Sequence, residues 1–294
     1  MIVDYDELAH NNNQELTDVI IANAGKMNPR YLVRNTNPSL APLILKLIED
    51  AKVNDGYIYA TCNPNVRIIE LLNSGKYYAI PNNPGITDHI IKMVEENESV
   101  IFRIAKNPDP KLTKIIKDFS IKIINLFKEK NFKTSMSDFI SVLSSNTNPE
   151  LAEVIMMSPY WAAVSSNSNT GLTKFIIANE DKLNIRELSA NTNPELAGLI
   201  LKNIRKCELD LIAQNPNPGL IEFIKKYIDI LDLDLSLQNP NPELAKLIIA
   251  NTTKENFNYV LSNNNPGLTK FILDAIAVDS ADNADSAKST VQNQ

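Results

Sequence analysis

Residues 215–220 read Asn-Pro-Asn-Pro-Gly-Leu, and residues 239–244, 24 positions later, read Asn-Pro-Asn-Pro-Glu-Leu. With the first Asn of this phrase counted as position 1, position 4 recurs every 24 residues, at Thr170, Pro194, Pro218, Pro242 and Pro266. A fixed period of about 20–50 residues is typical of solenoids, in which each repeat buries its apolar face only against its neighbours. The sequence therefore predicts a repeat protein.

Each copy of the phrase carries a signal for the start of a helix. Position 3 is Asn or Asp, whose side chain accepts a hydrogen bond from the free amides of a first helical turn. Position 4 is usually proline, which has no amide to leave unpaired and a backbone angle suited to a helix. We therefore expect position 3 to cap a helix that begins at position 4, in eleven copies that run from Asn11 to Asn263.

The residues after the phrase have the spacing of one buried helix face. Apolar residues stand at positions 6, 9 and 10, for example Leu196, Leu199 and Ile200. Apolar pairs six and three residues before the next phrase, such as Ile185 and Leu188, predict a second, shorter helix. The predicted fold class is all-α: an α-solenoid superhelix of about ten two-helix repeats with a period near 24 residues.

Two features leave a choice of interpretation. The Asn at position 1 could line a polar groove or hold turn backbone that is shielded from water. We favour the structural role, because a recognition surface varies between repeats and this position barely does. Residues 231–235 alternate between Leu and Asp, which suits an extended or 3₁₀ segment, but we expect a short helix there as in the other repeats.

The repeats are less regular in the first half of the chain. We divide the sequence into irregular repeats over 1–145, regular repeats over 146–276 that continue the first half, and a polar, disordered tail over 277–294. The widest gap between phrases predicts a lengthened helix over 111–129, before 135–144 resumes the pattern. Its lysines form the one locally basic patch: Lys111, Lys114, Lys117, Lys122, Lys128, Lys130 and Lys133.

The net charge and the composition restrict the classes of function that this protein can have. The formal net charge is −6 with a pI near 5.1, so the whole molecule repels a phosphate backbone. No apolar stretch is long enough for a membrane span and no signal peptide is apparent, so we expect a cytoplasmic protein. Cys62 and Cys207 lie in distant repeats, which argues against a structural disulfide.

The sequence shows little that points to catalysis. The two histidines, His10 and His89, have no nucleophile at a recognisable spacing, and we interpret His89 as a core residue. The chain has eight glycines and no phosphate-binding glycine loop. Two Cys and two His do not have zinc-site spacing, and Asp229, Asp232 and Asp234 lack the pattern of a calcium loop. We predict a non-enzyme with no catalytic, cofactor-binding or metal-binding residues.

One segment stands out as a candidate protein-binding site. Residues 156–161 contain the only tryptophan, beside a tyrosine and two methionines, in a repeat shortened to 21 residues. Trp, Tyr and Met are enriched at interaction hot spots. The alternative is that the Trp merely fills the short-helix position that Ile185 and Phe257 occupy elsewhere. The candidate binding residues are Met156, Met157, Tyr160 and Trp161.

The phrases at 215–220 and 239–244, with weaker copies back to Asn11, resemble the repeats of the leucine-rich repeat variant family. They resemble still more closely the tandem Asn-Pro repeats of large DNA viruses. The chain lacks the extra Pro-Pro spacing and the N-terminal cysteine cluster of the first group, and the regular tryptophan of the second. The resemblance implies alternating α and 3₁₀ helices, an interaction scaffold, and a viral or virion origin.

Three functions follow as hypotheses. The first is a non-enzymatic protein–protein interaction scaffold, which the long surface of a solenoid suits. The second is a nucleic-acid-binding helical-repeat protein that uses the basic patch at 111–133, against which the net charge argues. The third is a repeat-built enzyme, which would need a pocket joining groups from several repeats. We expect a protein partner, no membrane association and no cofactor, and the sequence does not indicate an oligomeric state.

Overall fold

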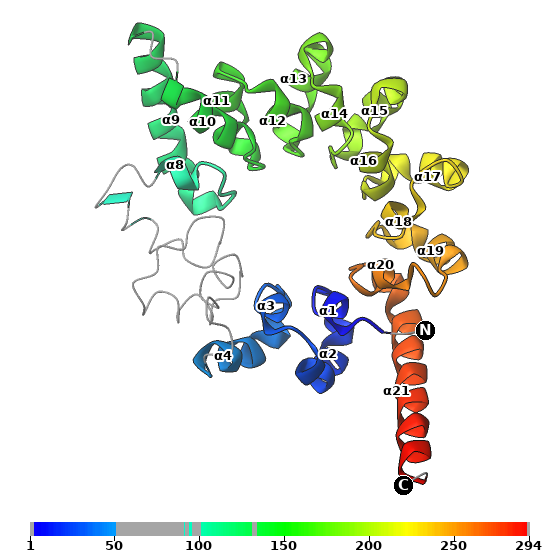
Figure 1. Ribbon diagram of the computed structural model, residues 1–294. Coiled ribbons are helices and arrows are strands. Elements are labelled where there is room, and N and C mark those ends of the chain that lie inside the picture. Colours follow the sequence, from blue (N-terminus) through cyan, green and yellow to red (C-terminus); the bar gives the residue numbers. More distant parts are fainter. Residues whose placement is uncertain (1–2, 51–90, 92–93, 96–100, 131–133, 293–294) are drawn as a thin grey trace. The chain divides into compact units, whose positions relative to one another are not determined.

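The structure is a computed structural model that describes residues 3–50, 91, 94–95, 101–130 and 134–292. Within these residues the chain is helical and has no strand (Figure 1), so the all-α fold class is confirmed. Contacts divide the chain into two units, each described by itself. Unit 1 contains Met1–Ile68 and Ile221–Gln294, and unit 2 contains Ile69–Leu220.

Unit 2 contains the first three regular repeats, residues 146–214. The part of it from residue 101 onward contains the α-helices α8 (Ile101–Ile104), α9 (Pro110–Lys130), α10 (Thr134–Ser144), α11 (Ala152–Met157), α12 (Trp161–Ser166), α13 (Thr173–Ala178), α14 (Ile185–Leu188), α15 (Ala197–Lys202) and α16 (Leu209–Gln214). In Figure 1, α13 and α15 lie on one side of this stack, and α14 and α16 lie on the other. The lengthened helix predicted over 111–129 and the helix predicted over 135–144 are α9 and α10.

Unit 1 is built from both ends of the chain. The N-terminal part contains α1 (Tyr5–Leu8), α2 (Thr17–Asn23), α3 (Pro29–Leu32) and α4 (Ala41–Glu49). The C-terminal part contains α17 (Ile221–Tyr227), α18 (Leu233–Ser236), α19 (Ala245–Asn251), α20 (Phe257–Leu261) and α21 (Thr269–Gln292). The alternating run at 231–235 is helical from Leu233, because Asp232 caps the first turn of α18 by accepting the N–H of Leu235.

Each phrase that the structure describes opens a helix as the sequence predicts, and in all of them except the one before α9, which is α-helical from Pro110, the first turn is a 3₁₀ turn over positions 4–6. Examples are Pro149–Leu151, Pro194–Leu196 and Pro242–Leu244, and the α-helix follows from position 7. The side chain of position 3 accepts the N–H of position 5, as Asn193 does from Glu195 at 3.0 Å. The residues at positions 6 and 10 form the core, with Leu172, Ile176, Leu196, Ile200, Leu220, Ile224, Leu244, Ile248, Leu268 and Ile272 all buried.

The Asn at position 1 joins consecutive repeats. In unit 2 the Nδ2 of Asn191 donates to the carbonyl oxygens of Ser165 at 2.8 Å and Asn167 at 2.9 Å, both in the turn that lies one repeat earlier. Its Oδ1 accepts the N–H of Asn193 in its own phrase at 2.9 Å. The same three bonds recur at Asn35, Asn146, Asn167, Asn215 and Asn263. The predicted structural role is therefore confirmed, because these buried side chains satisfy turn backbone between repeats. We call this series of bonds the Asn ladder.

We call the contact between two consecutive repeats a joint. A second hydrogen bond across each joint depends on the residue at position 7 of the preceding repeat. Where that residue is Thr, the Nδ2 of the position-3 Asn donates to its hydroxyl, as Asn193 does to Thr173 at 2.8 Å. Where it is Ala, the Nδ2 donates to a carbonyl instead, as Asn217 does to Asn193 at 2.8 Å, and position 5 is Gly. Gly171, Gly219 and Gly267 each face an Ala in this way. From 167 to 269, position 5 thus alternates between Gly and Glu, and position 7 alternates between Ala and a β-branched residue (Thr or Ile), which gives a period of two repeats.

The structure differs from the sequence-based domain division in two places. The ends of the chain share unit 1 rather than separate domains, because the first repeat contacts the last. The predicted disordered tail at 277–294 is helical as far as Gln292 in α21. This stretch contains no Gly or Pro and has alanines throughout, so nothing ends the helix that the last phrase begins. The superhelical form and the number of ten repeats stay predictions.

Candidate functional site

The candidate segment 156–161 connects α11 to α12 in the shortened repeat of unit 2. Neighbouring repeats place a 3₁₀ turn between their two α-helices, at Glu180–Lys182 and Ile204–Lys206. Here Met157 ends α11, and the chain passes through Ser158, Pro159 and Tyr160 directly into α12. The shortened link brings the end of one helix close in sequence to the start of the next. Met157 and Tyr160, both exposed, therefore flank the same link.

Trp161 is held by the fold. Its indole stacks on the ring of Phe175 in α13, with 5.4 Å between centroids and 13° between planes, and Lys182 Nζ lies 5.4 Å from the indole centroid. Phe257 and Phe271 hold the same two positions of a repeat in unit 1 and meet edge to face at 5.8 Å. Trp161 therefore occupies the short-helix position that the alternative interpretation assigned to it. Unlike the fully buried Phe257, it keeps part of its surface exposed.

The backbone of Tyr160 makes a hydrogen bond within the fold, and its ring is exposed. Its N–H donates to Ser144 Oγ at 3.0 Å, as the N–H groups of Asn184 and Glu208 donate to Ser165 and Ser189 in the next repeats. Before α1, α3, α14 and α18 the preceding residue caps the short helix through its side chain, as Asn184 does, whereas Glu208 and Asn256 make no such cap. Tyr160 makes no such cap, and 43% of its surface is accessible.

The two methionines differ in exposure. Met157 is 39% exposed, and Met156 is partly buried. Met156 stands at position 11 of its repeat, where the next two repeats carry Ile177, which is 49% exposed, and Leu201, which is partly buried. The sequence analysis missed this series of apolar residues at position 11. Its signal was present, because the same position holds Ile21 and Ile249, which are also exposed, in unit 1.

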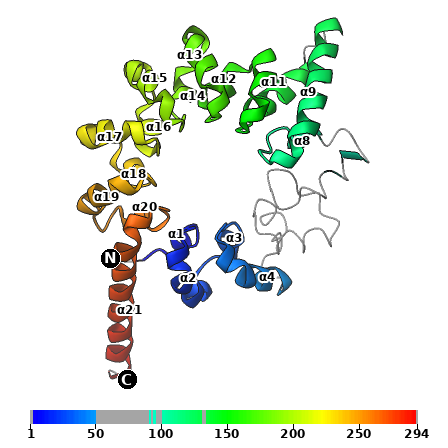
Figure 2. The ribbon, with the colours of Figure 1, turned by 180° about the vertical axis from the view of Figure 1, so that it is seen from behind.

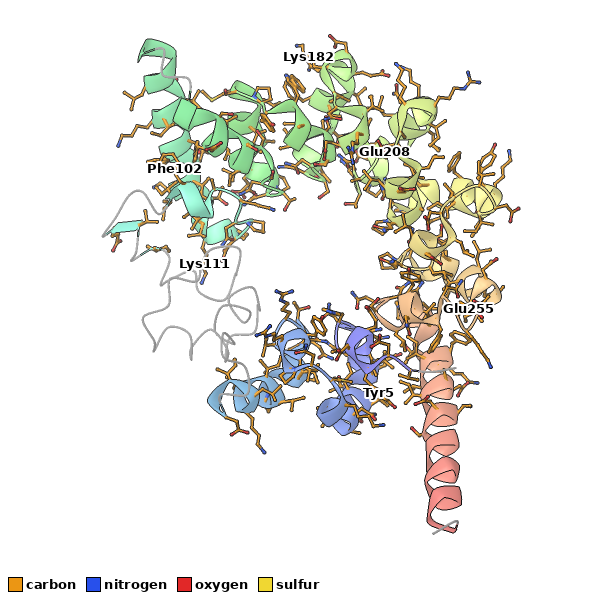
Figure 3. The ribbon with its side chains drawn as sticks, in the orientation of Figure 1. Tyr5, Phe102, Lys111, Lys182, Glu208 and Glu255 are labelled. Carbon is orange, nitrogen blue, oxygen red and sulfur yellow. The ribbon has the colours of Figure 1, made fainter. Side chains whose placement is uncertain are left out.

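The basic patch is partly neutralised where the structure describes it. Lys111, Lys114 and Lys122 are exposed on α9, but Lys117 pairs with Glu153 of α11 at 3.3 Å, and Asp118 is exposed on the same helix. The side chains of Lys128, Lys130 and Lys133 lie outside the described residues. Lys111 is labelled in Figure 3.

The groups considered for chemistry are dispersed. The ring of His10 packs against Tyr31 at 4.6 Å, while His89 and Cys62 fall outside the described residues. Cys207 is a half-buried free thiol whose pKa is raised by burial. Asp232 serves as the cap of α18. Across the described part of the chain, no three His, Cys, Asp or Glu side chains are grouped as a metal site would need.

Comparisons with protein-family models, with curated proteins and with solved structures find no match for this chain. Of the helices that the structure describes, none has both the length and the apolar character required to cross a bilayer.

Proposed function

We propose that this chain is a non-enzymatic scaffold that binds a protein partner at the surface formed by Met157, Tyr160 and the exposed part of Trp161. The observation that carries the proposal is the Tyr160 ring, which is exposed at a position where a polar side chain caps the short helix in four other repeats. An aromatic ring that contributes no cap and is accessible to solvent is available for a partner.

The surroundings of Tyr160 support this proposal. Trp161 is fixed by its stack on Phe175, so part of the surface is rigid before any partner arrives, which lowers the entropy lost on binding. Met157 on the other side of the link is flexible and polarizable, and such side chains adapt to the shape of a partner. The ladder asparagines are buried within the fold, which leaves them little surface for recognition.

Photo-crosslinking tests this proposal directly. A benzophenone amino acid is placed at Tyr160 in the full chain, and its matched control is the same residue at Tyr259, a 38% exposed tyrosine of a short helix in unit 1. We expect one protein to be crosslinked from the native host extract at 160 and not at 259. The double substitution Met157→Ala with Tyr160→Ala should then abolish co-purification of that protein, whereas Ile249→Ala with Tyr259→Ala should preserve it.

The same experiment separates the alternatives. Equal crosslinking at both positions would contradict a specific site at Tyr160. Recovery of nucleic acid, with an affinity that falls steeply with salt, would favour the basic patch at 111–133 instead. On α9 the pairing of Lys117 with Glu153 and the exposed Asp118 argue against that alternative. The viral origin, the cytoplasmic or virion location and the absence of enzyme activity stay predictions.

A further inference from the structure

The first repeat of the chain stacks on the last repeat through the Asn ladder. Asn11 Nδ2 donates to the carbonyl oxygens of Leu261 and Asn263, both at 2.8 Å. One repeat later, Asn35 Nδ2 donates to the carbonyl oxygens of Ala9 and Asn11, also at 2.8 Å each. The joint between residues 250 positions apart thus has the same geometry as the joint between neighbours in sequence.

Two further bonds repeat across this joint. The N–H of Asn12 donates to Asn264 Oδ1 at 2.6 Å, as the N–H of Thr36 donates to Asn12 Oδ1 at 2.8 Å. Asn13 Nδ2 donates to the Thr269 hydroxyl at 2.7 Å, as Asn37 Nδ2 donates to the Thr17 hydroxyl at 2.9 Å. The first repeat therefore occupies the place that a further repeat would take after residue 276.

Side chains outside the phrases close the same joint. Both ribbon views place α1 beside α20 (Figures 1 and 2), and the two helices are in contact. The hydroxyl of Tyr5 donates to Asp279 Oδ2 in α21 at 3.5 Å, and Figure 3 shows Tyr5 on the side of α1 that faces α21. Asp279 is 8% exposed, so α21 extends past the last phrase and is covered there by the first repeat.

The pairing of position 7 in one repeat with position 5 in the next agrees with this order. Gly stands at position 5 only where the preceding repeat has Ala at position 7, as in Gly267 after Ala245, among the joints that the structure describes. The last repeat has Thr269 at position 7, and the first repeat has Glu15 at position 5. The residues of the first repeat are thus those expected of a repeat that follows the last one.

We propose that this joint is a latch, in which the first repeat, residues 5–26, covers the open face of the last repeat within one chain. That face presents the buried backbone carbonyls of Leu261 and Asn263, which need donors that an Asn phrase supplies. Where the structure describes the chain, a closed latch covers the ladder face of the last repeat, so a second copy cannot stack there, and we expect the native protein to be monomeric. Because the joint is not covalent, chains that fold together at high concentration exchange first repeats and form dimers.

Distance measurements on the full chain test the closed latch. Spin labels are introduced through unnatural amino acids at Gln14 and Asn258, which are both exposed. A doubly labelled chain diluted into unlabelled chain should give one narrow, short distance that does not change with concentration. A broad or long distribution would overturn the proposal. A short distance in a dilute native mixture of singly labelled chains would also overturn it, because the contact would then be between copies.

A matched pair of variants tests the role of the ladder bonds. Asn11→Ala removes the donors at the latch, and Asn35→Ala removes the same donors at the next joint. We expect Asn11→Ala to raise amide exchange in residues 257–268 by about tenfold or more, and Asn35→Ala to leave that segment unchanged. Equal exchange there in wild type and Asn11→Ala would overturn the latch. If Asn11→Ala does not fold, the milder Asn264→Ala, with Asn12→Ala as its control, gives the same comparison.

Refolding tests the exchange between copies. Wild-type protein refolded from denaturant at high concentration should contain dimers, and a mixture of singly labelled chains should acquire the short distance only in that dimer. Refolding of dilute protein should give monomer. Asn35→Ala should still form dimers and Asn11→Ala should not. Monomer alone at every concentration, or dimers in both variants alike, would overturn the exchange.

Discussion

Gly219 lies so close to Ala197 that a Cβ atom added to the glycine would overlap the Cβ of the alanine in the preceding repeat. The same relationship holds between Gly171 and Ala152, where the distance would be 2.8 Å, and between Gly267 and Ala245, where it would be 2.6 Å. These glycines are required by the approach of two repeats and not by an unusual backbone angle. The size of position 7 in one repeat therefore sets the residue at position 5 in the next.

Gly219→Ala should destabilise unit 2 by about 1–3 kcal/mol, because a methyl group is forced into a filled joint. Adding Ala197→Gly should recover part of that loss by removing the atom it meets. The measurement is chemical denaturation of the two single variants and the double variant. Gly198→Ala is the control, since nothing lies within 4 Å of its added Cβ in α15, and it should stabilise by about 0.5–1 kcal/mol. Equal losses in the single and double variants would contradict the pairing.

Asn191→Ala should cost more than about 2 kcal/mol, because it leaves two buried carbonyls and the N–H of Asn193 without their partner. Thr192→Ala, at the exposed position 2 of the same phrase, should change stability by less than about 0.5 kcal/mol. Amide exchange should locate the loss at the joint between residues 165–167 and 191–193. A uniform loss over the whole chain, or none, would contradict the ladder.

Asn191→Asp removes the two hydrogen bonds that the Nδ2 of Asn191 donates but keeps the size of the side chain. The new carboxylate keeps the acceptor for Asn193 but faces the carbonyl oxygens of Ser165 and Asn167, so its pKa in the folded state is raised above the unfolded value. Stability of this variant should therefore fall as pH rises through that pKa, since the folded state binds the proton more tightly. Denaturation as a function of pH measures it, and an Asn191→Ala variant should lack the added pH dependence.

The helix caps and the structural role of the position-1 Asn could be predicted from the sequence. An Asn followed by Pro signals a helix start through residues that are adjacent in the chain, and the structure places Asn193 and Asn241 as caps accordingly. The constancy of position 1 was enough to assign it a structural role. The short helix at Leu233–Ser236 was also expected, although its capping residue, Asp232, was not.

The features that could not be predicted from the sequence depend on contacts between repeats. The pairing of Gly219 with Ala197 needs the knowledge of which residues face each other between repeats. The bond from Asn11 to Leu261 joins the two ends of the chain, and no local pattern indicates it. No local pattern indicates the stack of Trp161 on Phe175 either. This stack gives the Trp161 side chain a structural role, whereas the ring of Tyr160 beside it is exposed.

Trp161→Ala should destabilise unit 2 by more than about 1 kcal/mol, because it removes an aromatic stack in addition to buried surface. Tyr160→Ala and Met157→Ala should each change stability by less than about 0.5 kcal/mol, since both side chains are exposed. Thermal denaturation of the three variants checks the difference. A large loss in Tyr160→Ala would show that its ring serves the fold, and would remove the main support for a binding role.

Glu180 lies beside Lys202 and Asn203 of the following repeat, at 2.6 Å from Lys202 Nζ and 2.9 Å from Asn203 Nδ2. The bond from Lys202, followed by the bond from Asn203, lowers the pKa of the Glu180 carboxyl below its ordinary value. A lowered folded-state pKa contributes stability above the unfolded pKa, and that contribution is lost as pH falls through the folded value. It should be small, because the lysine is exposed and salt screens the pair.

Carboxyl titration by NMR should show the Glu180 pKa rising toward its ordinary value in Lys202→Met, and rising less in Asn203→Ala. Lys202→Met keeps the length of the side chain, so a change reflects the lost charge and donor rather than lost packing. Added salt should shift the wild-type pKa in the same direction as Lys202→Met. An unchanged pKa in Lys202→Met would mean that the two side chains do not stay paired in solution, and that the Asn ladder and the Asn193–Thr173 hydrogen bond hold this joint without them.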